Sequence, residues 1–408
     1  MYRIGKLCVG GQFNLYIPLS LLGFEWVNRY GVQYFRSVGR GVRRAIRVLI
    51  ALTFLLGLEG CAGFNFFRQA AAGQMDLLQR AQPIDEVLAN PGTPPALATK
   101  LKLAVEIRRF ASERLQLPDN AAYTRYTDVG RPYVVWNVIA TPALSLQPEV
   151  HCFPFAGCVP YRGYHLEADA KREAAALQQQ GLDVYLYGVP AYSTLGWFDD
   201  PLLSTVLGYG EADLARLIFH ELAHQVAYVA GDSAFNEAFA TAVELEGIEL
   251  WLAQRQDAQA FGRYQLGEQR RAGFHRLMRD TRQQLAALYA TDQPAEAKRL
   301  GKLAVLQDLS QRYQQLKREW GGYGGYDGWF DPPPNNAHFS ILATYHDKVP
   351  ALRRLFQQEG RDFARFYQRI RMLTAMSQAG RDAELARLAE GLPVESAPSA
   401  AVQQGDKQ

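Results

Sequence analysis

One segment of the chain combines residue types that could bind a metal ion and activate water. His220, Glu221 and His224 form the pattern His-Glu-x-x-His. In an α-helix, residues i and i+4 lie on one face, so both imidazoles can reach the same zinc ion. Glu221 would stand beside the ion and take a proton from a bound water whose pKa the metal has lowered. The pattern predicts a hydrolytic zinc site, and the alternative is a buried helix with two hydrogen-bonded histidines.

The flanking sequence predicts two helices that could position this site. Acidic residues over 211–213 begin an apolar pattern with helical spacing, so the motif should lie inside the first helix. Stop and N-cap signals at 231–233 start a second helix over 234–252. Catalytic zinc takes three protein ligands, and we expect Glu237 on the second helix to be the third. Glu244 is the alternative ligand, and the carboxylate that does not bind zinc can accept the spare ring N–H of a ligating histidine.

These residues resemble the gluzincins, which are metallopeptidases with a His-Glu-x-x-His helix and a glutamate third ligand. In that clan the third ligand stands in an Asn-Glu-Ala or Asn-Glu-Gly step, matched here by residues 236–238, and the aminopeptidase branch has a further glutamate that Glu244 matches. The resemblance implies that Glu237 binds the metal and that Glu244 supports a ligating histidine. Only twelve residues separate His224 from Glu237, fewer than is usual in the clan, which implies a shorter connecting loop.

A closer resemblance extends from about Gln74 to Arg371. The chain is similar there to a family of lipoprotein-like, zinc-dependent aminopeptidases of Gram-negative bacteria. The matching segments are 83–88, 130–138, 152–158, 191–201 and the zinc-binding segment. The resemblance implies hydrolysis of a peptide or protein substrate at one zinc ion.

The remaining sequence predicts an α+β fold that is predominantly helical. Residues 132–139 and 184–189 are β-branched or aromatic runs between turn residues, so we expect a small sheet beside the zinc-binding helix, as in a zincin-like core. In zincins an edge strand binds the substrate backbone, and residues 184–195, which include Tyr192, are the candidate. The alternative is that the tyrosines of this segment are ordinary strand and core residues.

We divide the chain into a leader or membrane anchor, a metallopeptidase body and a tail. The boundaries are 1–60, 61–393 and 394–408. Within the body we expect a helical hairpin at 61–125, the sheet with the zinc helices at 126–255, and a helical part at 256–393 that begins with two long antiparallel helices. The tail is small and polar, which predicts disorder.

The N-terminal region predicts export. Basic residues over 43–47 precede an apolar run over 48–58, which is the order of a secretory signal and is too short for an ordinary membrane span. Cys61 follows in a context that resembles a bacterial lipoprotein processing site, which implies a lipid-anchored protein on the periplasmic side of the cell envelope. Glu59 is an unusual residue for such a site, and an uncleaved N-terminal anchor is the alternative.

The cysteines agree with an oxidising compartment. Cys152 and Cys158 are the only pair in the body, and the residues between them include a proline and a glycine. They predict a disulfide that closes a small loop. The alternative is a metal site with His151 and His165, although the spacing matches no familiar zinc pattern.

Several polar residues are candidates for binding substrate. Asp199 and Asp200 precede a proline just upstream of the catalytic helix, and either could bind the α-ammonium group of a peptide, although Asp-Pro is also a common turn. Asn336 could contact substrate or cap a helix. Gluzincins stabilise the oxyanion with a Tyr or His donor besides zinc, and the downstream candidates are Tyr345, which we favour, Tyr326 and His338.

Composition argues against a nucleic-acid-binding function. The net charge is only +3, and no basic run with interleaved aromatic residues is present, so no nucleic-acid partner is expected. Aminopeptidase activity is the primary hypothesis. The alternatives are an endopeptidase that acts on periplasmic proteins or peptidoglycan cross-links and a non-catalytic, zinc-stabilised scaffold. The presence of Glu221 argues against a scaffold, because a structural zinc site needs no base.

Overall fold

The computed structural model describes residues 62–153, 157–194, 196, 198–342 and 348–390. The leader, the lipidation candidate Cys61 and the tail at 394–408 therefore lie outside the described residues. The chain divides into two compact units, residues 1–74 and 75–408. Helix α4 (Ala62–Arg80) contains the described residues of the first unit and continues into the second, and everything below concerns the second.

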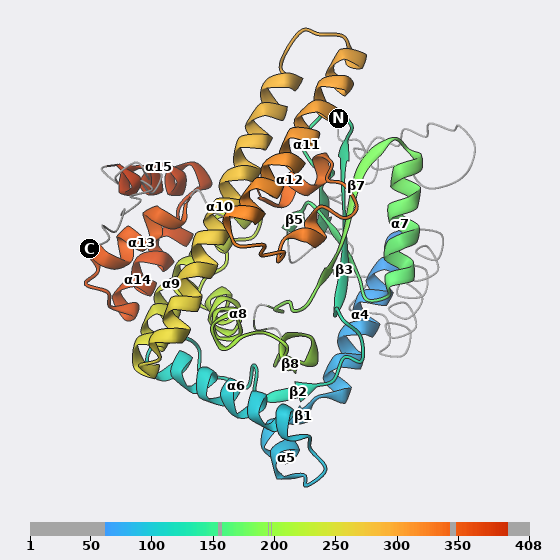
Figure 1. Ribbon diagram of the computed structural model, residues 1–408. Helices are drawn as coiled ribbons and strands as arrows, with labels where there is room; N and C mark the ends of the chain where they lie inside the picture. Colours follow the sequence, from blue (N-terminus) through green and yellow to red (C-terminus); the bar gives the residue numbers. More distant parts are fainter. Residues whose placement is uncertain (1–61, 154–156, 195, 197, 343–347, 391–408) are drawn as a thin grey trace, which may run out of the picture. The chain divides into compact units, whose positions relative to one another are not determined.

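Helices make up most of the second unit, which confirms a predominantly helical α+β fold (Figure 1). The helices after α4 are α5 (Ile84–Ala89), α6 (Pro95–Glu113), α7 (Glu167–Gln179), α8 (Glu211–His224), α9 (Ser233–Arg255), α10 (Ala258–Tyr289), α11 (Ala295–Glu319), α12 (Asn336–Leu342), α13 (Val349–Gln358), α14 (Phe363–Thr374) and α15 (Gln378–Ala389), with 3₁₀ turns η3 (Ser204–Val206) and η4 (Asp327–Trp329). The strands are β1 (Gln82–Pro83), β2 (Arg125–Thr127), β3 (Val135–Pro142), β4 (His151–Phe153), β5 (Gly157–Val159), β6 (Arg162–Tyr164), β7 (Leu182–Val189) and β8 (Leu202–Leu203).

The expected sheet has the antiparallel order β6-β3-β7. Its strands β3 and β7 are those predicted from sequence, with bounds shifted by up to three residues. Helices α7 and α12 lie on its two sides (Figure 1). Register aligns Asn137 with Gly163 on β6 and with Tyr187 on β7, so these residues share one face. On that face Tyr185 stacks on His338 of α12, with ring centroids 3.8 Å apart.

The segment predicted as one helical hairpin before residue 125 contains α5, α6 and strand β1 in addition to α4. Strand β1 pairs with β2, and β2 pairs in parallel with β8, about seventy-five residues further along the chain. Partners this distant leave no local pattern, and two-residue strands show no alternation, so the sequence predicted neither β1 nor β8.

The main hydrophobic core surrounds α8 and α9. Phe219 of α8 and Phe235 and Phe239 of α9 are fully buried, and α6, α13 and α14 cover them. At Gly247 α9 lies close to α8 and to Leu115, because a Cβ there would lie 2.7 Å from a Leu115 methyl group and 2.9 Å from the Phe219 ring. A larger residue at this position would push the two helices apart.

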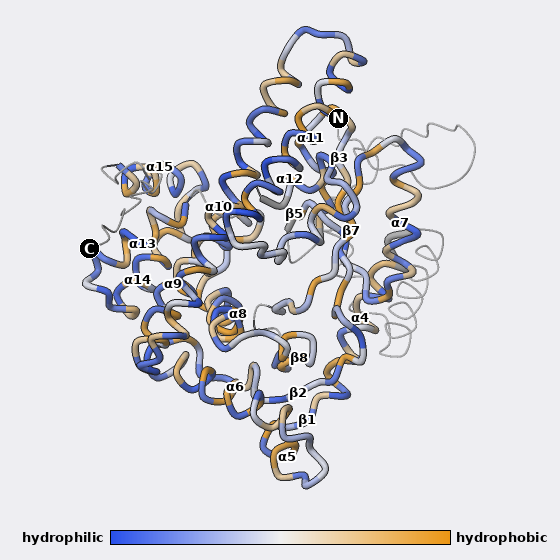
Figure 2. Tube along the Cα trace, viewed as in Figure 1, coloured by the Kyte–Doolittle hydropathy of each residue, from blue (hydrophilic) through white to orange (hydrophobic). Residues whose placement is uncertain are grey.

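Helices α10 and α11 form the predicted antiparallel pair, and a second core lies beneath them. Phe274, Leu285 and Leu309 are buried in it. The colouring along both helices is mainly hydrophilic, as expected for a pair with one solvated face (Figure 2). Among the described residues, no helix is both long enough and apolar enough to span a membrane.

A buried ion pair ties the C-terminal helices to the start of α9. Asp232 caps α9 by accepting a hydrogen bond from the Phe235 N–H at 3.1 Å. Its other oxygen accepts hydrogen bonds from Arg381 of α15, at 2.9 Å to Nε and 2.5 Å to Nη2. Arg381 is 1% exposed and Asp232 is 3% exposed, so neither charge has water as an alternative partner.

We therefore expect Arg381→Met to lower the free energy of unfolding by about 3–5 kcal/mol, because it leaves the buried Asp232 carboxylate with only the longer ion-pair contact to Lys348, at 4.0 Å. Adding Asp232→Asn should restore part of the loss, since asparagine still caps the helix without a charge. Urea unfolding of the metal-free chain measures both. Arg387→Met, which removes an exposed ion pair within the same helix, is the control and should change stability little. If Arg381→Met and Arg387→Met lowered the free energy of unfolding equally, the buried ion pair would not have the stabilising role that we assign to it.

Candidate metal centre

Helices α8 and α9 bring three potential metal ligands together. His220 and His224 lie one turn apart on α8, and Glu237 faces them from the second turn of α9. Their ligand atoms all lie within 4.8 Å of one another, and they are the only such group among the residues that the structure describes. The Nε2 atoms of the two histidines are 3.2 Å apart, and the Glu237 carboxylate is 3.2 Å from His220 Nε2 and 3.8 Å from His224 Nε2.

This donor set fits zinc. Two imidazole nitrogens bound to one tetrahedral zinc at about 2.0–2.1 Å each lie roughly 3.4 Å apart, close to the separation of the His220 and His224 Nε2 atoms. Without a metal, the same two nitrogens are close enough to share a hydrogen bond. The carboxylate of Glu237 supplies the third ligand and leaves a fourth position open.

A short turn between the helices keeps the three ligands in register. Residues 225–232 connect α8 to α9, and Asn236 closes the connection by accepting from the Val229 N–H and donating to the Val229 carbonyl, both at 2.8 Å. Asn236 is 1% exposed, so these bonds are shielded from water. The reduced interval between His224 and Glu237 is thus accommodated by a turn that one side chain holds.

Glu244 lies behind His220, outside the ligand cluster. Its Oε2 atom is 2.8 Å from His220 Nδ1. A histidine that donates Nδ1–H to a carboxylate keeps its Nε2 lone pair free for a metal. The arrangement places Glu237 among the potential ligands and Glu244 in the supporting position.

In the metal-free site the pKa values of the two histidines are shifted in opposite directions. Burial opposes the charged form of His220, but its bonds to Glu237 and Glu244 outweigh burial and hold its pKa well above the usual range. Burial and the charge of His220 lower the pKa of His224 to about 4. Zinc needs both rings neutral, so its binding must displace the His220 proton.

Glu221 sits next to the cluster in an acidic, enclosed environment. Burial raises its pKa from 4.5 to about 7, and the charges of Glu237 and Asp200 add to this while His220 opposes it. A carboxylate whose pKa lies near neutrality can both accept and return a proton at physiological pH. Position and basicity therefore suit Glu221 for general-base chemistry.

The raised pKa predicts a stability change in the metal-free protein. The folded state binds the Glu221 proton more tightly than the unfolded chain, so this stabilisation is full below pH 4.5 and is lost as pH rises through about 7. Glutamine does not titrate, so Glu221→Gln should be more stable than wild type at pH 8, by at most about 3 kcal/mol, and similar at pH 4. Urea unfolding in the presence of a chelator at several pH values measures this. If the difference in unfolding free energy between wild type and Glu221→Gln were the same at every pH, the raised pKa of Glu221 would be contradicted.

Three tyrosines that the sequence did not single out as polar site residues lie near the cluster. Burial and the neighbouring carboxylates Glu237 and Glu221 raise the pKa of Tyr161, which lies just before β6. Tyr187 of β7 accepts a hydrogen bond from Asn137 at 3.1 Å, and the charge of Glu237 adds to burial in raising its pKa. The Tyr228 ring meets the His224 ring edge-on, with centroids 6.5 Å apart. Tyr161 had no signal in the sequence because β6, which follows it, has only three residues and pairs with a remote strand, whereas Tyr187 lies in the segment expected to bind substrate.

A loop before β2 supports α8 from the side of α6. Arg108 of α6 is 6% exposed and donates to backbone carbonyl groups of this loop, namely those of Pro118, Asn120 and Ala122 at 2.7, 2.9 and 3.0 Å. Asn120 in turn donates to Gln225, the residue after His224, at 2.7 Å. Tyr123 ends the loop with φ 64°, and burial together with the charge of Glu221 raises its pKa. The C-terminal end of α8 is therefore hydrogen-bonded to a loop that Arg108 contacts at three carbonyl groups.

The predicted substrate residues occupy different surroundings. Asp200 is 3% exposed, its carboxylate accepts from Thr194 N at 2.7 Å and Thr194 Oγ1 at 3.0 Å, and burial raises its pKa. Asp199 is exposed. Tyr192 packs edge-on against His165, with centroids 6.1 Å apart. Of these residues, Asp200 lies close enough to Glu221 to affect its pKa.

The C-terminal candidates lie apart from the cluster where the structure describes them. Asn336 is fully buried, donates to the Ala143 carbonyl at 2.9 Å and accepts from the Tyr289 hydroxyl at 2.8 Å. Tyr326 stacks on Phe274 in the second core, with centroids 4.1 Å apart, and His338 stacks on Tyr185. Tyr345 lies outside the described residues.

Cys152 and Cys158 form a disulfide that joins β4 to β5. Their sulfur atoms are therefore not free to bind a metal with His151 or His165. The covalent link closes the hairpin that precedes Tyr161 and β6.

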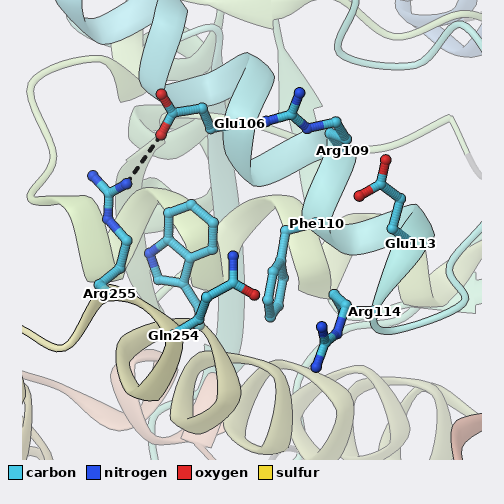
Figure 3. A pocket seen from close by; sticks show the side chains of 8 residues that line it. Glu106, Arg109, Phe110, Glu113, Arg114, Gln254 and Arg255 are labelled. Carbon is cyan, nitrogen blue, oxygen red and sulfur yellow. Dashed lines mark hydrogen bonds and ion pairs between the residues drawn. The ribbon is translucent and has the colours of Figure 1, made fainter.

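A polar cavity of about 390 Å³ lies elsewhere, between α6 and the end of α9 (Figure 3). It is lined by Glu106, Arg109, Phe110, Glu113, Arg114, Trp251, Gln254 and Arg255. Arg255 pairs with Glu106 at 3.1 Å across it. No residue of the metal cluster lines this cavity, so it is separate from the chemistry proposed below.

The fold and the site define an α+β protein in which two packed helices present a His-His-Glu cluster with a neighbouring glutamate. The model of the family described as "Putative aminopeptidase" matches residues 65–385. The chain therefore belongs to that family, and its description suggests peptidase activity. Comparisons with curated proteins and with solved structures give no significant match.

Proposed function

We propose that this protein is a zinc-dependent aminopeptidase. The observation that carries the proposal is the convergence of His220, His224 and Glu237 within 4.8 Å, with Glu221 beside them. These three side chains would hold one zinc ion. Zinc bound there would lower the pKa of a water molecule and polarise the scissile carbonyl group.

Glu221 acts as the proton carrier in this proposal. Its carboxylate takes a proton from the attacking water and delivers it to the leaving amine, which requires a pKa between those of the two partners. The enclosed, acidic surroundings that raise the pKa of Glu221 to about 7 support this role. Glu244 holds His220 in the tautomer that directs Nε2 at the metal.

Tyr161 stabilises the developing oxyanion. Its hydroxyl lies in the electrostatic field of Glu237 and Glu221, and no hydrogen bond to it is found among the described residues. A preorganised donor of this kind contributes more in the transition state than in the ground state. The sequence favoured Tyr345 for the same role, and that residue remains a second candidate.

Substrate would lie along β7 and present its free N-terminus to an acidic environment. Within the described residues β7 is an edge strand of its sheet, and Tyr187 on it lies near Glu237. An exposed edge can bind an extended peptide by adding a strand. The negative charges of Asp200 and Glu221 favour an α-ammonium group, which is the feature that separates an aminopeptidase from an endopeptidase.

We also propose that the body works on the periplasmic side of the cell envelope, anchored through a lipid on Cys61. The disulfide supports an oxidising compartment. The basic and apolar order of the leader supports export.

The primary test compares wild type with Glu221→Gln. Both proteins should contain one zinc per chain, since Glu221 is not a ligand, while kcat/KM should fall by about 10²–10⁴ in the variant. Metal analysis and hydrolysis of free and N-acetylated peptides measure these quantities. Glu249→Gln, on the same helix as Glu237 but paired with Arg353, is the control and should retain activity.

The outcomes separate the alternatives. Acetylation should abolish cleavage by an aminopeptidase, and equal cleavage of free and acetylated peptides would instead indicate an endopeptidase. Zinc without any cleavage in wild type would favour the scaffold. A wild-type protein that binds no zinc would overturn the proposal.

Tyr161→Phe tests the oxyanion donor. Removing one such donor should lower kcat by about 10²–10³ and leave KM and zinc content nearly unchanged. Tyr164→Phe, three residues later on β6 and paired across the sheet with Trp136, is the control and should behave as wild type. Steady-state kinetics decide between Tyr161 and Tyr345, because an unchanged kcat in Tyr161→Phe would assign the role elsewhere.

A further inference from the structure

Arg216 lies on α8 one turn before His220 and reaches between three helices. Its Nε atom donates to Glu244 Oε1 of α9 at 3.1 Å, and Nη2 donates to the same oxygen. Its Nη1 atom donates to Glu268 Oε1 of α10 at 2.5 Å. No local pattern in the sequence points to Arg216, because its partners are 28 and 52 positions away.

The two oxygens of Glu244 have different partners. Oε1 accepts from Arg216, while Oε2 faces His220 Nδ1 at 2.8 Å. The guanidinium therefore fixes the rotation of the carboxylate, and the carboxylate fixes the rotation of the imidazole. A chain of contacts runs from Glu268 through Arg216 and Glu244 to the ring whose Nε2 atom belongs to the ligand cluster.

Because Arg216 and Glu244 are buried, this series of contacts is sensitive to the loss of either side chain. The side chains of Arg216 and Glu244 are each only 11% exposed, so water cannot replace the missing partner. Glu268 is 31% exposed and also contacts Arg271 at 3.0 Å, so the series of contacts reaches the protein surface at α10. Arg216 is thus the buried link between the metal-binding helices and the α10–α11 pair.

We propose that Arg216 is a positioning residue of the metal centre, which sets the affinity for zinc by orienting His220 through Glu244, and that Glu268 of α10 holds Arg216 in place. This inference rests on the zinc site of the proposed function. It adds that the affinity depends on a helix that contributes no ligand. Lysine could supply the charge of Arg216 but not its several directed donors.

The test is the dissociation constant for zinc, measured on the full chain by competition with a chromophoric chelator. The variants are Arg216→Met, Arg216→Lys and Glu268→Gln. Arg353→Met is the control, because Arg353, like Arg216, bridges two glutamates; its partners are both on α9, Glu246 at 2.7 Å and Glu249 at 2.9 Å, and it does not contact the cluster. Thermal unfolding of the metal-free proteins shows whether each variant is folded.

We expect Arg216→Met to weaken zinc binding by about 10–100-fold, the range seen when a supporting partner of a metal ligand is lost. Arg216→Lys should weaken it less, and Glu268→Gln, which removes a partly exposed partner, by about two- to fivefold. Arg353→Met should bind zinc as wild type does, even if it lowers the melting temperature as much as Arg216→Met.

A double-mutant cycle tests whether Arg216 acts through Glu244. In the Glu244→Gln background, Arg216→Met should cost less zinc affinity than it does in wild type, because the carboxylate it orients is gone. If zinc affinity of Arg216→Met stays within about twofold of wild type, the inference is wrong, whereas the proposed function is unaffected. If wild type binds no zinc, the proposed function itself fails. Should Arg216→Met not fold, Arg216→Lys and Glu268→Gln carry the same test.

Discussion

The close packing of α8 against α9 is the constraint on which the rest of this structure depends. Gly247 allows the two helices to meet, with Phe219 and Leu115 filling the space that a side chain would take. The same two helices carry the two histidines of α8 and Glu237 of α9, whose ligand atoms lie within 4.8 Å of one another. The candidate metal site thus depends on how the two helices pack as well as on its ligands.

The same interface buries charges that oppose folding. Glu221, Glu237 and Glu244 lie close together, and loss of water, with repulsion from the other two carboxylates added to it, raises the pKa of Glu221 to about 7. Arg216 and His220 compensate part of this in the metal-free protein, and a bound cation would compensate more. The large apolar core around Phe235 and Phe239 offsets the remaining cost.

The outer elements orient the site without providing ligands. Arg381 of α15 holds the N-cap of α9, and Asn120 holds the end of α8. Asn335 and Asn336 bind α12 to the backbone at Val184 and Ala143, which sets the sheet face that carries Tyr185 and Tyr187. The contacts of Arg381, Asn335 and Asn336 are buried or partly buried, whereas that of Asn120 is exposed.

Local patterns in the sequence were sufficient for the metal-binding helix, the two helices 258–289 and 295–319, and strands β3 and β7, because helical spacing and alternation are visible within one segment. They also identified His220 and His224, whose spacing is set by helical geometry, while the resemblance to gluzincins favoured Glu237 as ligand and Glu244 as its support. Tertiary structure alone placed Tyr161 near Glu221 and joined Arg216 to Glu268, because these contacts link segments with no shared local pattern. Chemistry that depends on one helix and its neighbour could be predicted from sequence, whereas chemistry that depends on strand register and burial between remote segments required the fold.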